Sequence, residues 1–219
     1  MSQYYGQFIN LLAAVLLLLS FAMLGQRRIL SLINLFMAQG AVLCMSTAVV
    51  ALATDQTHLY WSALITLVLK VFLLPWILHR LIRRLNVKWD VETLINIPTT
   101  MLIGIVLVIF SFNLALPISE LAGTLTRSLL GIAMACVLLA FLMMITRSKA
   151  VPQVIGFLSM ENGLFFAATS ATYGMPMVVE LGIALDVLVG TVILGVFFFQ
   201  IREKFESLDI RHLEQLKED

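Results

Sequence analysis

Three ionisable side chains interrupt otherwise apolar stretches of this sequence: Lys70, Glu161 and Asp186. Glu161 is the clearest of them, because it lies near the middle of the run Val151–Tyr173, which has no other charge. A charged residue at the centre of a membrane-spanning helix costs about 2.5–3.5 kcal/mol on insertion scales, and such residues are usually functional. We therefore expect these three side chains to carry the chemistry of the chain.

The three charges are predicted to lie at a similar depth. At about 1.5 Å per helical residue, Glu161 lies about 15 Å from the inner end of its run and Asp186 about 15 Å from the outer end of the next. Lys70 falls close to the same level. Burial and a nearby opposite charge change proton affinity in opposite directions, so small movements of these groups could pass a proton along. This placement predicts a proton relay.

A structural ion pair, for instance between Lys70 and Asp186, is the alternative explanation for these charges. Such a pair would hold helices together without moving protons. Polar residues along the acidic run favour the relay, because Ser159, Asn162 and Thr169 could hold water or a hydrogen-bond network. The sequence alone leaves both interpretations open.

The residues that usually hold metals are placed too far apart to do so here. His58, His79 and His212 lie at or beyond the ends of apolar runs, so no two of them can clamp a haem at membrane depth. Cys44 and Cys136 lie inside apolar runs, far from each other in sequence, and a cluster or a disulfide framework needs more cysteines. We expect no cofactor or metal in this chain.

The composition is that of a membrane protein. Of the 219 residues, 61% are hydrophobic and 12% are charged, which is outside the range of soluble globular domains. The formal net charge is +1, and nucleic-acid binding requires a concentrated positive surface. Membrane lipids are therefore expected partners, and nucleic acids are not.

Seven apolar runs are long enough to span a membrane. About 20 helical residues cross a hydrocarbon core of about 30 Å. We predict spans at Phe8–Leu24, Leu30–Ala53, Leu59–Leu78, Leu94–Leu116, Ser128–Thr146, Val151–Tyr173 and Met177–Gln200, with a kink near Pro75 in the third. The predicted fold class is an all-α integral membrane protein with about seven transmembrane helices.

Basic residues follow a one-sided pattern along these runs. Of the 14 Lys and Arg residues, 12 fall on one side, whereas Arg127 lies on the other side and Lys70 within the membrane. Inner loops carry an excess of Lys and Arg, which predicts an outer N-terminus and an inner C-terminus. Met1–Gln7 lacks the basic start of a cleavable signal peptide, so we expect the first run to remain as a helix. The simplest location is the inner (plasma) membrane of a bacterium or archaeon.

A weak internal repeat relates the second and sixth runs. Ile33–Gly40 aligns without gaps on Ile155–Asn162, which places Gln39 over Glu161. A parallel repeat of three helices fits this alignment, and chance similarity between apolar helices fits it equally well. The expected organisation is an N-terminal three-helix unit, a linking fourth helix, a second three-helix unit and an inner tail, at residues 1–93, 94–126, 127–200 and 201–219.

Three short motifs carry a resemblance to a known family. Ser159–Gly163 reads SMENG, Val179–Asp186 reads VELGIALD, and the tail contains Ser207–Ile210. With these motifs the chain resembles hydrogenase-4 component E (HyfE), a membrane subunit of group 4 nickel-iron hydrogenases and formate hydrogenlyase-type complexes. Its last three predicted helices look like the NuoK subunit of complex I and the MrpC subunit of cation/proton antiporters.

The resemblance implies roles for individual residues. Glu161 matches the mid-membrane glutamate of the second NuoK helix, which belongs to a chain of charges along the membrane arm of complex I. The position of a second NuoK glutamate falls near Gly190, one turn beyond Asp186, so the equivalence of Asp186 stays open. Lys70 has no counterpart in NuoK.

The resemblance also implies a function for the whole chain. It indicates a non-redox subunit that contributes to proton translocation beside antiporter-like membrane subunits. Nickel-iron and iron–sulfur centres would then lie in the hydrogenase arm of the same complex. A subunit of a multi-subunit cation/proton antiporter and a purely structural membrane scaffold are the alternatives.

Overall fold

The computed structural model describes residues 2–54, 57–85, 91, 93–122, 127–172, 188 and 195. Nearly all of them lie in helices, as the sequence predicts. The elements are α1 (Ser2–Leu24), α2 (Ile29–Thr54), α3 (Thr57–Thr66), the π-helical segment η1 (Leu67–Leu73), α4 (Leu74–Leu85), α5 (Ile97–Ala122), α6 (Arg127–Thr146) and α7 (Ala150–Thr172).

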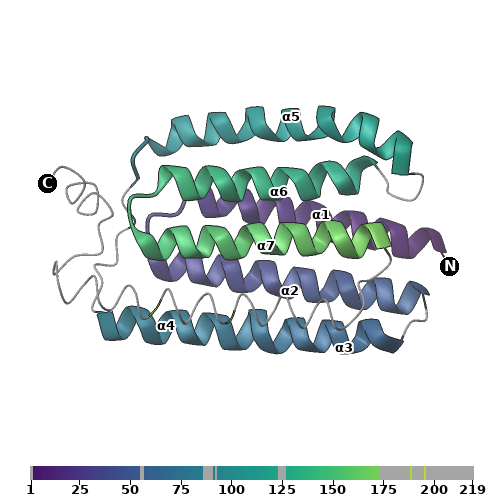
Figure 1. The fold of residues 1–219 in the computed structure, drawn as a ribbon, viewed down its shortest axis with the longest axis horizontal. Coiled ribbons are helices and arrows are strands. Elements are labelled where there is room, and N and C mark those ends of the chain that lie inside the picture. Colours follow the sequence, from purple (N-terminus) through teal and green to yellow (C-terminus); the bar gives the residue numbers. More distant parts are fainter. Residues whose placement is uncertain are drawn as a thin grey trace, which may run out of the picture.

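The helices form a bundle in which they run side by side along the longest axis (Figure 1). Helix α6 packs against α5, α7 and α1, and α2 packs against α1, α7, α3 and η1. The four helices α1, α2, α6 and α7 thus form the centre, with α5 on one flank and α3, η1 and α4 on the other. The largest buried cluster of the described residues joins side chains from early and late helices of the sequence, including Phe36 of α2, Leu78 of α4 and Leu158 of α7.

Five described helical stretches are long and apolar enough to cross a membrane: Tyr4–Leu24, Ile29–Leu52, Ala63–Arg80, Ile97–Pro117 and Ser128–Thr146. They correspond to the first five predicted spans. In lipid, a helix satisfies its own backbone polar groups, which is why these apolar sequences adopt this structure. The sixth prediction coincides with α7. The seventh, at 177–200, lies outside the described residues except for positions 188 and 195, so the count of seven stays a prediction.

Arg147, directly after α6, fastens the end of α1. Its Nη2 donates hydrogen bonds to the carbonyl oxygens of Met23 at 3.2 Å and Leu24 at 2.6 Å. The last carbonyls of a helix have no partner within the helix and carry partial negative charge, so a cation is favourable there. Arg147 is only 1% exposed. Burial lowers the pKa of Arg147 to about 10, and the guanidinium therefore remains charged at neutral pH.

A short segment before α5 is hydrogen-bonded to the turn after α1 and to the end of α6. The Val91 amide donates to the Arg27 carbonyl at 2.7 Å, and the Leu94 amide donates to the Thr146 carbonyl at 2.8 Å. Thr93 forms an isolated antiparallel bridge with Arg147. The turns after α1 and after α6 therefore lie at the same end of the bundle. Their basic residues gather at this end, as the one-sided charge pattern requires, while the orientation in the membrane stays a prediction.

We expect Arg147→Gln to lower the thermal stability of the purified chain. The shorter glutamine leaves the carbonyls of Met23 and Leu24 without a charged donor, and a hydrogen bond to a charged group contributes about 1.5–3 kcal/mol. The unfolding midpoint should fall by roughly 5 °C or more, since 1 kcal/mol corresponds to about 2–4 °C in a chain of this size. Exposed Arg28 supplies the control, and an equal loss in Arg28→Gln would contradict a specific role for Arg147.

Candidate functional site

Lys70 lies in the π-helical segment η1. The amide of Leu74 at the end of this segment donates to the carbonyl of Leu69, the i to i−5 pattern of a π-helix. Pro75 follows, and in a straight α-helix its ring would clash with the carbonyl of Val71. Where the sequence predicts a kink, the chain thus widens into a π-helical segment, a rare element that is frequent at functional sites.

Lys70 forms a buried ion pair with Glu161 of α7. The Lys70 Nζ lies 2.7 Å from Glu161 Oε1 and 2.6 Å from Oε2. The two side chains are only 4% and 10% exposed. Both carboxylate oxygens thus accept hydrogen bonds from one ammonium group, the geometry of a charge-assisted pair. Two of the three predicted residues are brought together, although they are 91 positions apart in the sequence.

The surroundings of the pair hold Lys70 in place from two neighbouring helices. Its Nζ lies 4.8 Å from the ring centroid of Phe165, one turn beyond Glu161 on α7, which allows a cation–π interaction. From α2, Gly40 approaches so closely that an added Cβ would lie 3.3 Å from Lys70 Cβ. A larger residue at position 40 would push η1 away from α2.

A second buried polar chain begins at the residue after Glu161. Asn162 Nδ2 donates to Gln39 Oε1 at 3.1 Å, Gln39 Nε2 donates to Ser20 Oγ at 2.9 Å, and Ser20 Oγ donates to the Leu16 carbonyl at 3.0 Å. This chain joins α7, α2 and α1 through the centre of the bundle. Asn162 Oδ1 is buried and accepts no hydrogen bond from the described part of the chain. A buried acceptor of this kind is a natural site for an internal water molecule.

The sequence anticipated these groups only in part. It predicted a hydrogen-bond network around Glu161, and Asn162 takes part in one. Thr169, one of the two hydroxyls considered there, instead donates to carbonyls of its own helix, Phe165 at 3.0 Å and Phe166 at 3.1 Å. Ser20 was not anticipated, because a single serine in an apolar helix usually bonds only to its own backbone.

Asp186, the third predicted residue, lies outside the described residues. The structure therefore does not test the alternative ion pair between Lys70 and Asp186. What the structure adds is that Lys70 already has Glu161 as a partner. Within the described ranges, no three His, Cys, Asp or Glu side chains are grouped closely enough to hold a metal ion.

Comparison with known proteins reveals distant relatives over nearly the whole chain. A Mycobacterium tuberculosis protein named Uncharacterized protein Rv0085 is 29% identical over 211 residues, which cover 96% of each chain. Hydrogenase-4 component E of Escherichia coli K12 is 23% identical over 210 residues, 95% of this chain and 97% of the relative, and the Shigella flexneri protein gives the same values. No protein-family profile matches, and no solved structure does. The chain is thus a distant relative of hydrogenase-4 component E.

We expect Gln39 and Asn162 to be energetically coupled. Gln39→Leu leaves the Asn162 amide buried without its acceptor, and Asn162→Leu leaves Gln39 Oε1 without its donor; each should cost about 1–3 kcal/mol. The double variant should lose less than the sum of the two, by about 0.5–3 kcal/mol. Unfolding of the four proteins in mild detergent measures this coupling.

Asn113 is the matched control for this cycle. It is exposed on α5, and its Nδ2 donates to the Ile109 carbonyl of its own helix at 2.8 Å. Asn113→Leu should therefore change stability little. Strictly additive losses at Gln39 and Asn162 would show that the hydrogen bond between them does not contribute to stability.

Proposed function

We propose that this chain is a non-redox membrane subunit of a hydrogenase-4-like respiratory complex, related to complex I, and that it takes part in proton translocation. The distant relation to hydrogenase-4 component E over 95% of the chain supports the assignment to such a complex. The observation that supports the proton role is the buried ion pair of Lys70 and Glu161 at a π-helical segment.

A buried ion pair is a costly way to join two helices. Well-packed apolar residues of similar size often give equal or greater stability, because they avoid the desolvation of two charges. Ionisable residues at membrane depth are accordingly rare and usually serve ion or proton movement. The cost of the Lys70–Glu161 pair therefore favours a function beyond packing.

We propose that the pair works by exchange of partners. A proton that reaches Glu161 neutralises the carboxylate and weakens its hold on Lys70. The ammonium group then needs another anion, and Asp186, placed by the sequence at the same depth, is the proposed second partner. Lys70 would thus connect Glu161 and Asp186 in one relay, and its position in the π-helical segment would permit the small movement.

A structural clamp is the second candidate, and one observation favours it. Both carboxylate oxygens of Glu161 are bonded to Lys70, and Phe165 and Gly40 fix the lysine further. Such an arrangement can hold α7 against η1 without any transfer of protons. The two candidates differ in what happens when both charges are removed together.

The proposed setting is the inner (plasma) membrane of a bacterium or archaeon, with the N-terminus outside and the C-terminus inside. Residues 127–200 would form the NuoK-like unit beside antiporter-like subunits. Nickel-iron and iron–sulfur centres would belong to the hydrogenase arm. A cation/proton antiporter without a hydrogenase arm is the rival assembly, and it would use the same helices and charges.

The double variant Lys70→Met with Glu161→Leu separates the relay from the clamp. Removing both charges avoids the loss of about 3–5 kcal/mol that follows when one member of a buried pair is left alone. We expect an assembled complex that retains hydrogenase activity with a soluble electron acceptor and loses proton translocation in inverted membrane vesicles. Translocation at the wild-type level would reject the relay in favour of the clamp.

Glu161→Gln provides the companion measurement. Glutamine keeps the size of the side chain and removes its charge, so Lys70 loses its ion pair with the Glu161 carboxylate. We expect the same loss of translocation as in the double variant, together with lower thermal stability. A variant that is unstable but still translocates protons would again indicate a clamp.

The assignment to a hydrogenase complex is tested by isolating the partners. A tag after Asp219, on the predicted inner side, should recover nickel-iron and iron–sulfur subunits from membranes dissolved in mild detergent, as identified by mass spectrometry. Untagged membranes serve as the control. Recovery of antiporter-like subunits alone would replace the hydrogenase assignment by that of a cation/proton antiporter.

A further inference from the structure

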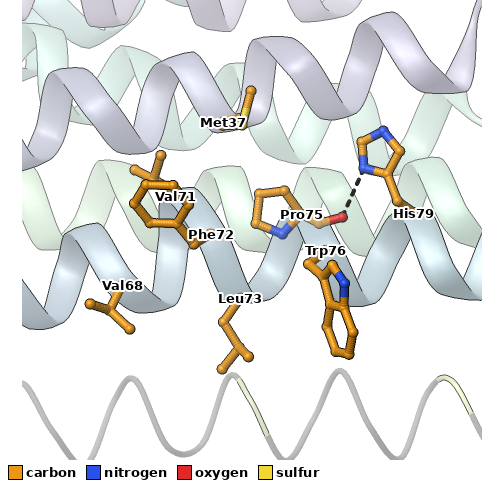
Figure 2. A pocket seen from close by; sticks show the side chains of 8 residues that line it. All are labelled: Met37, Val68, Val71, Phe72, Leu73, Pro75, Trp76 and His79. Carbon is orange, nitrogen blue, oxygen red and sulfur yellow. Dashed lines mark hydrogen bonds between the residues drawn. The ribbon is translucent and has the colours of Figure 1, made fainter.

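A cavity of about 520 Å³ is lined by side chains of η1 and the start of α4, together with one side chain of α2. Val68, Phe72 and Trp76 follow one another at intervals of four along its wall and are 50%, 63% and 57% exposed. Figure 2 shows the lining side chains along η1 and the start of α4, with Met37 opposite them on α2. Among the described lining residues, polar side-chain atoms belong only to Trp76 and His79.

The length of this groove matches one leaflet of a bilayer. Val68 and His79 are eleven positions apart, or about 17 Å at 1.5 Å per residue. One leaflet of a hydrocarbon core of about 30 Å has a thickness of about 15 Å. Val68 lies two positions before Lys70, and the apolar stretch that includes both ends at Arg80. The groove therefore extends from the depth of the ion pair to the membrane surface.

The surface end of the groove carries a positive charge. Arg80 is exposed, and its Cζ lies 5.2 Å from the ring centroid of Trp76, which orients the guanidinium beside the groove. The Nδ1 atom of His79 lies 2.9 Å from the Pro75 carbonyl, so it is not free to donate to a ligand in the groove (Figure 2). An apolar groove with one cation at its mouth is complementary to an apolar chain with an anionic head.

We propose that this groove binds an anionic phospholipid of the same leaflet, with an acyl chain along Val68, Phe72 and Trp76 and the phosphate at Arg80. Basic residues at membrane surfaces attract anionic lipid heads, and aromatic side chains are favoured at that level. The bound chain would contact η1, the segment that holds Lys70. This inference does not depend on the proton role of the pair.

Lipid titration of the purified full-length chain tests the proposal. Native mass spectrometry measures binding of phosphatidylglycerol and of phosphatidylethanolamine with the same acyl chains. We expect tighter binding of phosphatidylglycerol, and a loss of about fivefold in Arg80→Gln, the effect of about one basic residue at an anionic surface. Arg28 is exposed and is not among the described lining residues, so Arg28→Gln should bind as the wild type does. Equal losses in both variants, or none in Arg80→Gln, would overturn the proposal.

A photoreactive amino acid at position 72 tests the same groove in intact membranes. Cross-linking to phospholipid, reduced by Arg80→Gln, supports the proposal. Cross-linking to residues 177–200 or to another subunit in place of lipid overturns it, because the groove would then be filled by protein. Phe72 is 63% exposed, so this substitution leaves the packed interior unchanged.

Discussion

The contact between Lys70 and Glu161 determines how the two halves of the bundle meet. An ammonium and a carboxylate that are both withdrawn from solvent attract each other strongly, and separating them would cost free energy because neither is well solvated there. The contact thus fixes the height of η1 relative to α7. Lys70 makes this contact from within the π-helical segment, which ends just before Pro75.

Helix α7 connects this ion pair to the amide chain through two consecutive residues. Neighbours in a helix point about 100° apart, so Glu161 and Asn162 face different helices. Glu161 reaches η1, and Asn162 reaches Gln39 on α2. Glu161 therefore lies next to a set of hydrogen bonds that extends to α1. This adjacency places the ion pair beside the amide chain in the centre of the bundle.

The sequence allowed the helices to be predicted, because an apolar run of sufficient length has few other structures available in lipid. It also identified Lys70 and Glu161, since charges in such runs are conspicuous. Their direct contact was not foreseen, because hydropathy gives depth and says little about rotation around a helix axis. The hydrogen bond of Ser20 was not predicted for a related reason. A serine in the sequence does not indicate which distant side chain, such as the Gln39 amide, it contacts in the packed bundle.

The hydrogen bonds from Arg147 to the end of α1 have a consequence for the synthesis and membrane insertion of the protein. Arg147 is 123 positions beyond Leu24, whose carbonyl it binds. At a synthesis rate of about 5–20 residues per second, the ribosome needs about 6–25 s to make the intervening chain. During that interval, water or the insertion machinery must supply hydrogen-bond donors to the last carbonyl groups of α1. The carbonyls of Met23 and Leu24 thus gain these hydrogen bonds only after α6 has been made.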